Sequence, residues 1–328
     1  MTEVAVVVPV YNRRSKLLRT LATVVAQSKQ PALLIVVDDG SSDGTGQFAE
    51  SWLARNASFE WKVIRQANAG AAAARNAGFA AIGSLPFVCF LDSDDLWPPE
   101  FLAEGLHAIE GRDDAVAAIA DRVQQVAGRR QPVENLRQLV PNPILWIVCN
   151  DGGILSCALI RSTAVRAAGL FVPGMIASED SDFFIRLFQL GAAVRSDATP
   201  VRQIKKARLE PTEAPNLSDA SPDLPYLWAR HLDAALSTLP KSLFKEHRTL
   251  MRTAVARRWA CSAFSSRRTH QIGRAIISLF YAVWWDYKWR RRGQLIWSFC
   301  RGNNRVLAYY KIKLWRSHKE NRKKRIWP

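Results

Sequence analysis

Four short apolar runs lie in the first 91 residues, and a helical pattern separates each run from the next. The runs are Val4–Val8, Leu33–Val37, Trp61–Ile64 and Phe87–Leu91. Their apolar residues are mostly continuous instead of alternating with polar ones, which indicates strands buried on both faces of a sheet. Helices between such strands supply the crossover connections that parallel pairing needs. The sequence therefore predicts an α/β fold with a mostly parallel central sheet.

Polar residues follow each of these four runs. They form the segments Tyr11–Arg13, Asp38–Ser42, Asn68–Gly70 and Asp92–Asp95. In parallel α/β sheets the ligand binds outside the carboxyl ends of the strands, so we expect the four segments at one edge of the sheet. Two of the segments are acidic, which suits a charged, hydroxyl-rich ligand with a metal ion. Four ordinary polar loops are the alternative.

The last of these segments places three carboxylates within four residues, at Asp92, Asp94 and Asp95. Like charges at such close spacing raise one another's pKa unless a cation holds them. A hard divalent cation such as Mn²⁺ or Mg²⁺ prefers oxygen ligands, and a diphosphate could complete its coordination shell. A solvated acidic turn is the alternative, because D-x-D is a short pattern.

Five segments together resemble, in order and spacing, the family 2 glycosyltransferases, which have the GT-A nucleotide-diphospho-sugar transferase fold. The segments are Val7–Arg13, Val36–Thr45, Asn68–Gly70, Ala74–Gly78 and Phe90–Asp95. The resemblance covers residues 3–200. It implies an enzyme that takes a sugar from a nucleotide-sugar donor.

The resemblance also implies which residues bind the nucleotide. Asp38 and Asp39 would accept hydrogen bonds from the base and the ribose, and Pro9 and Tyr11 would shape the base pocket. Arg75 would reach a base or a phosphate, and a surface arginine that pairs with the acidic loops is its alternative. The other predicted nucleotide-binding residues are Asn12, Asn68, Gly70, Asp92 and Ser93.

In the family that this sequence resembles, the D-x-D motif holds Mn²⁺ or Mg²⁺ against the donor diphosphate. Asp94 is therefore the first predicted metal ligand and Asp92 the second. Asp95 would be a further ligand or would orient the donor sugar. Gly153 and Ser156 lie in a segment that resembles the one that closes over the donor and lines the acceptor side.

The segment Ser178–Leu187 resembles the E-D-x-D helix start of the same family. The resemblance implies that Asp180 is the general base for the acceptor hydroxyl, a role worth about 10²–10⁴ in rate. Metal stabilisation of the leaving nucleoside diphosphate removes the need for a leaving-group acid, and single displacement inverts the anomeric centre. Glu179 and Asp182 are predicted sugar contacts. Their structural alternative is favourable interaction with the helix dipole.

Two observations favour the addition of one sugar over processive synthesis. Processive polysaccharide synthases have a Q-x-x-R-W motif, whereas Arg258-Trp259 lacks the glutamine. No apolar run reaches the ~18–20 residues of a spanning helix.

Three features indicate where the protein is located. The first residues do not resemble a signal peptide, and no spanning helix is predicted. The five cysteines form no C-x-x-C pair, which fits a reducing compartment. We therefore expect a cytoplasmic protein, peripheral on the inner face of the cell membrane.

Charge divides the chain into two parts. Residues 1–200 hold 18 Lys/Arg and 21 Asp/Glu, whereas residues 201–328 hold 28 and 8, respectively. We predict a catalytic domain over residues 1–204, a linker or loop over the active site at 205–225, and a helical region over 226–328. That helical region is basic and contains eight of the twelve tryptophans.

Basic amphipathic helices with interfacial tryptophan and tyrosine suit an anionic membrane surface, which is the partner that we predict for this region. The apolar stripes could instead pack on the catalytic domain or on a second copy in a homo-oligomer. We expect no nucleic-acid partner, because no recognisable nucleic-acid module is present.

The sequence therefore predicts an inverting, metal-dependent glycosyltransferase. It would move one sugar from a nucleotide-sugar, with a UDP-sugar favoured, to a glycan or lipid-linked acceptor in cell-envelope polysaccharide or lipopolysaccharide synthesis. A sugar-phosphate nucleotidyltransferase is one alternative, but such enzymes usually have a Gly-rich N-terminal loop, which Val8–Asn12 is not. A non-catalytic membrane-surface scaffold with a degenerate transferase domain is the other.

Overall fold

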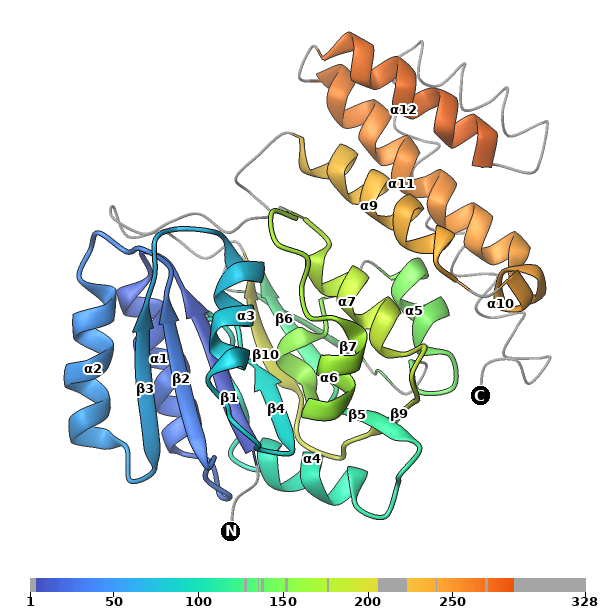
Figure 1. Cartoon of the computed structure of the whole chain (residues 1–328). Helices are drawn as coiled ribbons and strands as arrows, with labels where there is room; N and C mark the ends of the chain where they lie inside the picture. The colour runs from blue at the N-terminus through green and yellow to red at the C-terminus, as the bar shows by residue number, and fades with distance from the viewer. Residues whose placement is uncertain are drawn as a thin grey trace. The chain divides into compact units, whose positions relative to one another are not determined.

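A computed structural model describes the chain from the first strand to the last long helix (Figure 1). The described residues are 4–126, 129–134, 136, 139–150, 153–175, 177–205, 223–239, 241–268 and 271–285. Residues 206–222, which include most of the predicted linker, lie outside this part, as does the basic segment after residue 285.

The chain forms two compact units, which are considered separately below. The first unit contains residues 1–143, 153–175 and 186–216, and the second contains residues 144–152, 176–185 and 217–328. The second unit thus takes two short segments from the middle of the chain. The domain boundaries at residues 204 and 225 stay predictions.

The first unit is built on a seven-stranded sheet with the strand order β3-β2-β1-β4-β8-β5-β9. The strands are β1 (Val4–Val10), β2 (Leu33–Asp38), β3 (Glu60–Arg65), β4 (Phe87–Phe90), β5 (Ala115–Ile119), β8 (Ala158–Arg161) and β9 (Ala192–Arg195). Only β8 runs against its neighbours β4 and β5, and the other pairings are parallel. The prediction of a mostly parallel sheet is confirmed.

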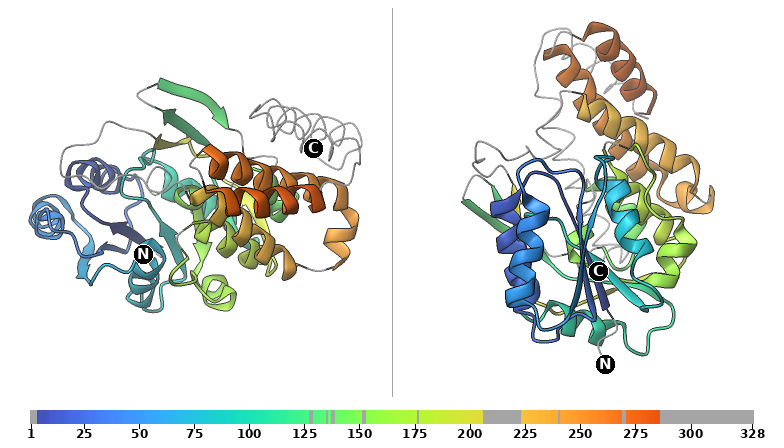
Figure 2. Two further views of the ribbon diagram at one scale, coloured as in Figure 1. Left: turned by 90° about the horizontal axis from the view of Figure 1, so that it is seen from above. Right: turned by 60° about the vertical axis from the view of Figure 1, so that its left-hand side comes forward.

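Helices cover both faces of this sheet, which is why its central strands are apolar at every position. The helices are α1 (Arg14–Val25), α2 (Thr45–Asn56), α3 (Ala71–Ala80), α4 (Phe101–Ile109) and α6 (Ser162–Ala168). Figures 1 and 2 show α1 and α2 on one face and α3 on the other. On β4, burial raises the pKa of the Cys89 thiol, so this cysteine stays protonated and unreactive in the core.

A second, three-stranded sheet has the order β10-β6-β7. Its strands are β6 (Arg122–Val126), β7 (Arg129–Glu134) and β10 (Val201–Lys205). Leu96, just beyond the acidic segment after β4, forms an isolated antiparallel bridge with Arg202 of β10. This bridge brings β10 beside the candidate site, although the two segments are about a hundred residues apart in sequence.

The second unit is helical. Its helices are α5 (Pro143–Cys149), α7 (Glu179–Leu187), α9 (Leu224–Ser237), α10 (Lys241–Glu246), α11 (Arg248–Arg268) and α12 (Ile272–Trp285), of which Pro143, Arg186 and Leu187 belong to the first unit. Helix α11 packs between α9 and α12 (Figure 1), and Ser262 and Ser278 form a buried hydrogen bond of 2.8 Å between α11 and α12. In the part of the chain that the structure describes, no helix has both the length and the apolar character to span a membrane.

Two contacts explain why segments from the middle of the chain join this helical unit. The Nδ1 atom of His231 in α9 makes a hydrogen bond with the carbonyl oxygen of Ala177, just before α7. The guanidinium of Arg257 in α11 donates to the carbonyl oxygen of Cys149, the last residue of α5. Helix ends leave backbone carbonyls without intrahelical partners, and Arg257 satisfies one of them.

Gly78 lets α3 pack closely against β1. A Cβ atom at this position would lie 2.3 Å from Val7 Cγ1 and 3.1 Å from Val37 Cγ2. We therefore expect Gly78→Ala to lower the free energy of unfolding by about 1–3 kcal/mol, because α3 or the sheet must shift to relieve the overlap. Chemical denaturation measures this change.

The matched control is Gly273→Ala, because a Cβ atom there would meet nothing within 4 Å. It should leave the free energy of unfolding unchanged or slightly higher. If Gly78→Ala unfolds at the same denaturant concentration as the unsubstituted chain, the close packing of α3 does not contribute to stability.

Candidate active site

The polar segments after β1, β2 and β4 meet at one edge of the sheet, because these strands are parallel and in register. Val10 lies opposite Asp38, and Val7 lies opposite Phe90. The segments after β1 and β2 are also joined directly, since Asn12 N donates to Ser41 Oγ (2.9 Å) and Ser42 N donates to Asn12 Oδ1 (2.8 Å). These bonds hold Asn12 at a φ of 48°, in the left-handed region that asparagine tolerates.

Asp38 and Asp39 are both buried, but they have different surroundings. Asp38 Oδ1 accepts a hydrogen bond from Ser41 N (2.9 Å) within its own turn. Both carboxylate oxygens of Asp39 accept hydrogen bonds from the segment that follows β3. Its Oδ1 accepts from Gln66 Nε2 (2.7 Å) and Ala69 N (2.9 Å), and its Oδ2 accepts from Gly70 N (2.8 Å).

These bonds give Asp39 a clear structural task, the positioning of Asn68–Gly70 beside the segment Asp38–Ser42. Gly40 is required at the same place, because a Cβ atom there would lie 2.8 Å from Asn68 N and the φ of Gly40 is 81°. The contribution of Gln66 was not predicted. A polar residue two positions before the Asn68–Gly70 segment gives no signal in the sequence that it will bind Asp39.

Arginines neutralise both aspartates of the D-x-D motif. Arg75 Nη2 lies 2.8 Å from Asp92 Oδ1, and Arg13 Nη1 lies 3.5 Å from Asp94 Oδ2. The positive charge of the two arginines therefore offsets the repulsion between the closely spaced carboxylates. Pairing of Arg75 with an acidic loop was one of its two predicted roles, but the side chain is buried and not on the surface.

Phe171 holds Arg75 in place. The Arg75 guanidinium carbon lies 5.3 Å from the centroid of the Phe171 ring, which is cation–π distance. Asn76 fixes the Phe171 backbone through two hydrogen bonds, from Asn76 Nδ2 to the Phe171 carbonyl (2.8 Å) and from Phe171 N to Asn76 Oδ1 (3.1 Å). The Ala74–Gly78 segment thus positions an arginine against the acidic turn formed by Asp92–Asp95.

Asp95 is fully buried and faces β10. Its Oδ2 accepts a long hydrogen bond from Gln203 Nε2 (3.4 Å), and the same amide donates to the Gly153 carbonyl (2.9 Å). Arg122 donates to the same Gly153 carbonyl and pairs with Glu134. Gln203 and Arg122 were missed by sequence reasoning, because both lie on the second sheet, which carries no motif.

Gly153 and Ser156, which were predicted to contact sugars, lie beside the D-x-D motif. Gly153 has a φ of 74°, in the region that favours glycine, and a Cβ atom there would lie 2.8 Å from Arg122 Nη1, so a larger residue would be strained and would displace the Arg122 side chain. Ser156 is buried, accepts a hydrogen bond from Asp92 N (3.2 Å), and accepts another at its carbonyl from Trp97 Nε1 (2.7 Å). The structure therefore places Ser156 beneath the backbone of the motif.

The three acids at the start of α7 belong to the second unit. Asp180 is half-buried, and its Oδ1 accepts a hydrogen bond from Ser181 N (2.7 Å). Glu179 is buried, and Asp182 N donates to the Ser178 carbonyl (2.9 Å), which begins the helix. Because Asp92–Asp95 belong to the first unit, the grouping of these acids with the D-x-D motif stays a prediction.

The oxygen ligands at the acidic turn fit a hard divalent cation. Among the described residues, no group of three or more His, Cys, Asp or Glu side chains is arranged to hold a metal ion. Mg²⁺ is usually held by one or two carboxylates together with substrate phosphates and water, and not by a cage of protein ligands. Asp92 and Asp94 supply two such carboxylates, so the residues fit a metal that binds together with a diphosphate.

The comparison with protein families agrees with this geometry. Residues 5–163 match the family described as glycosyl transferase family 2. Undecaprenyl-phosphate 4-deoxy-4-formamido-L-arabinose transferase of Pseudomonas fluorescens is 31% identical over 193 residues, which cover 58% of this chain and 54% of that protein. Succinoglycan biosynthesis protein ExoW of Rhizobium meliloti is 38% identical over 104 residues, which cover 31% of this chain and 32% of that protein. The chain thus spans from a third to about half of these relatives.

Solved structures of similar fold cover nearly the whole chain. Staphylococcus aureus TarS 1–349 in complex with UDP-GlcNAc aligns with a TM-score of 0.59 at 20% identity, over 92% of this chain and 93% of that one. Mannosyltransferase PcManGT from Pyrobaculum calidifontis, in complex with GDP-Man and Mn²⁺, aligns with a TM-score of 0.57 at 15% identity, over 95% and 83%. At these identities the likeness establishes the fold alone, and it confirms the prediction of a GT-A fold.

Proposed function

We propose that this chain, whose residues 5–163 match glycosyl transferase family 2, is an inverting, metal-dependent transferase of one sugar. The donor is a nucleotide-sugar, and the acceptor is a glycan or a lipid-linked glycan. The family match argues against the alternative of a sugar-phosphate nucleotidyltransferase.

One observation carries this proposal: both aspartates of the D-x-D motif are paired with guanidinium groups at the ligand-binding edge of the sheet. A diphosphate is the ligand that can use all four charged groups, since carboxylates hold a cation and arginines bind phosphate oxygens in a bidentate manner. Asp92 and Asp94 would hold Mn²⁺ or Mg²⁺. Arg13 and Arg75 would then have phosphate oxygens as alternative acceptors.

The bound cation would supply positive charge that stabilises the departing nucleoside diphosphate. Asp38, which lies at the end of β2, would accept from the base or the ribose, while Asp39 keeps the neighbouring segment Asn68–Gly70 in place. Asp180 would remove the proton from the acceptor hydroxyl as its oxygen attacks the anomeric carbon. The residues of this chain thereby orient both substrates and move one proton.

The named relatives support a role in cell-envelope polysaccharide synthesis. One is named for an undecaprenyl-phosphate sugar transferase and the other for succinoglycan biosynthesis. The similar solved structures contain UDP-GlcNAc in one case and GDP-Man with Mn²⁺ in the other. They support a nucleotide-sugar donor. We favour a UDP-sugar because TarS 1–349 with UDP-GlcNAc has the higher TM-score, 0.59 against 0.57, and is covered over 93% of its length against 83% for PcManGT.

Helix α12 supports a peripheral position on the inner face of the cell membrane. Ile272, Ile276, Phe280 and Trp284 are exposed large apolar residues at intervals of four, so they share one helix face. The net charge of the chain is +17, which attracts it to anionic lipid. A second copy of the chain is the alternative cover for this face.

Calorimetric titration of UDP, GDP and dTDP, with and without Mn²⁺, tests the proposed function. We expect one nucleotide to bind, and to bind tightly only when Mn²⁺ is present, because the metal neutralises the diphosphate beside Asp92 and Asp94. The same titration identifies the class of donor. Absence of binding by all three nucleotides in the presence of Mn²⁺ would overturn the transferase proposal in favour of the non-catalytic scaffold.

A further inference from the structure

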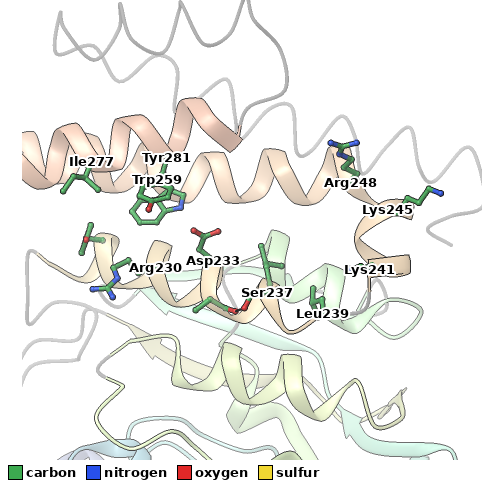
Figure 3. A pocket seen from close by; sticks show the side chains of 13 residues that line it. Arg230, Asp233, Ser237, Leu239, Lys241, Lys245, Arg248, Trp259, Ile277 and Tyr281 are labelled. Atoms are coloured by element: carbon green, nitrogen blue, oxygen red, sulfur yellow. Dashed lines mark hydrogen bonds between the residues drawn. The ribbon is translucent and has the colours of Figure 1, made fainter.

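The helical unit contains a pocket of about 930 Å³ that the donor site does not use. Helices α9, α10, α11 and α12 all contribute side chains to it (Figure 3). Figure 3 shows Trp259, Tyr281 and Ile277 toward one end and Lys245 and Arg248 toward the other. The pocket therefore has an aromatic end and a cationic end.

The aromatic end presents a hydrogen-bond donor that lacks an acceptor. Trp259 stacks on Tyr281 with 4.6 Å between ring centroids and an interplanar angle of 18°. Tyr226 meets Trp259 edge-on at 5.8 Å. Trp259 is only 2% exposed, yet its Nε1 atom has no hydrogen-bond partner. A buried N–H without an acceptor costs about 1–3 kcal/mol, which an oxygen atom of a ligand in the pocket would recover.

The cationic end presents charge that lacks a counter-charge. Lys241, Lys245 and Arg248 line the pocket and are exposed, and within the described residues none of them makes an ion pair. Arg230 also lines the pocket, but toward its aromatic end (Figure 3), with its guanidinium 5.8 Å from the centroid of the Tyr226 ring. Asp233 contributes one carboxylate to the described lining. Three cations at this end and a fourth at the aromatic end, against one acid in the described lining, give the pocket an excess of positive charge, which is the chemistry of a phosphate site.

We infer that this pocket binds a phosphate-bearing sugar. The phosphate lies at Lys241, Lys245 and Arg248, and the sugar ring lies against the aromatic end, where the Trp259 N–H donates to one of its oxygens. An apolar ligand would leave the cations and the indole N–H without partners, and a bare phosphate would leave the aromatic end empty. Under the proposed transferase function, the ligand is a phosphate-bearing part of the glycan acceptor. This last step rests on the proposed function.

The test is a calorimetric titration of the full chain with glucose 1-phosphate, glucose and inorganic phosphate. Glucose 1-phosphate should bind more tightly than either of the other two. The double variant Lys245→Gln/Arg248→Gln should weaken its binding by about tenfold or more, because two charge-assisted hydrogen bonds are lost. Binding of UDP with Mn²⁺ should stay the same in this variant.

The matched control is Arg19→Gln/Arg55→Gln, which removes the same charge from exposed positions on α1 and α2 of the first unit. It should bind glucose 1-phosphate as the unsubstituted chain does. Trp259→Phe keeps an aromatic ring but removes the N–H, and it should also weaken binding while the thermal unfolding midpoint shows that the helices remain folded. Equal weakening in the control, or full binding by both pocket variants, would overturn the inference.

Two further results are informative. One distinguishes a sugar phosphate from a lipid headgroup as the ligand of the pocket, and the other distinguishes failure of this inference from failure of the proposed function. If glucose 1-phosphate does not bind, but phosphatidylglycerol vesicles bind in a way that depends on Lys245 and Arg248, the pocket receives a lipid headgroup and the inference is overturned. If glucose 1-phosphate binds as expected while no nucleotide binds with Mn²⁺, the pocket stands and the proposed transferase function fails.

Discussion

Asp94→Ala is expected to abolish the metal-dependent part of nucleotide binding. Asp94 is 7% exposed, and it is the predicted first metal ligand after β4. Its removal leaves Asp92 as the single motif carboxylate and takes away the negative charge that lies 3.5 Å from Arg13. We expect the affinity for UDP in the presence of Mn²⁺ to fall by more than about a hundredfold. Substitution of residues that merely hydrogen-bond to a metal ligand already lowers metal affinity or activity by about 10–100-fold.

The measurement is a UDP titration with and without Mn²⁺ on the variant and on a control. Asp113→Ala is the matched control, because Asp113 is an exposed aspartate of the same unit that lies before β5, away from the acidic turn. It should bind UDP and Mn²⁺ normally. If Asp94→Ala shows the same dependence on Mn²⁺ as the unsubstituted chain, Asp94 is not a metal ligand.

Asp180→Asn is expected to keep nucleotide binding and to lose sugar transfer. Asparagine is close to aspartate in size and can still accept the hydrogen bond from Ser181 N, so the start of α7 should keep its conformation. It cannot take a proton from the acceptor hydroxyl. We expect the transfer rate to fall by about 10²–10⁴.

Steady-state transfer and nucleotide titration together check this prediction. A fall in kcat with an unchanged nucleotide Kd is the result expected for a general base. Asp113→Asn, which makes the same chemical change at an exposed position, should leave both quantities unchanged. Near-normal turnover by Asp180→Asn would remove Asp180 from the base role and would leave Glu179 and Asp182 as the other acids of that helix start.

Many features of the donor site follow from local sequence patterns. The continuous apolar runs at Val4–Val8 and Phe87–Leu91 identify strands because burial on two faces requires apolar residues at every position. Parallel pairing then puts Asp38 and Asp92 at one edge without any knowledge of side-chain contacts. Arg75 is a comparable case, since its place in the first turns of α3 puts it within reach of the acidic segment.

The partners of the buried acids could not be read in the same way. Gln203 contacts Asp95 across 108 positions of sequence, and it lies on a three-stranded sheet that no sequence pattern predicted. Arg13 follows the strand-end segment directly, but the sequence alone does not say whether its side chain turns toward Asp94 or toward solvent. Such choices depend on which side chains fill the remaining space once the sheets are packed.

For the helical unit, too, some features follow from the sequence and others from the tertiary structure alone. Sequence alone determined that the region after residue 226 is basic and rich in tryptophan, and it predicted helices there, because helical periodicity and charge are properties of neighbouring residues. Helices α9, α10, α11 and α12 lie in the described part of this region. Only the tertiary structure decided that α9, α10, α11 and α12 leave a pocket lined by Trp259 and Lys245, and that Asp180 belongs with these helices. A pocket exists where helices fail to fill the space between them, and that depends on how distant segments pack and not on the order of residues along any one of them.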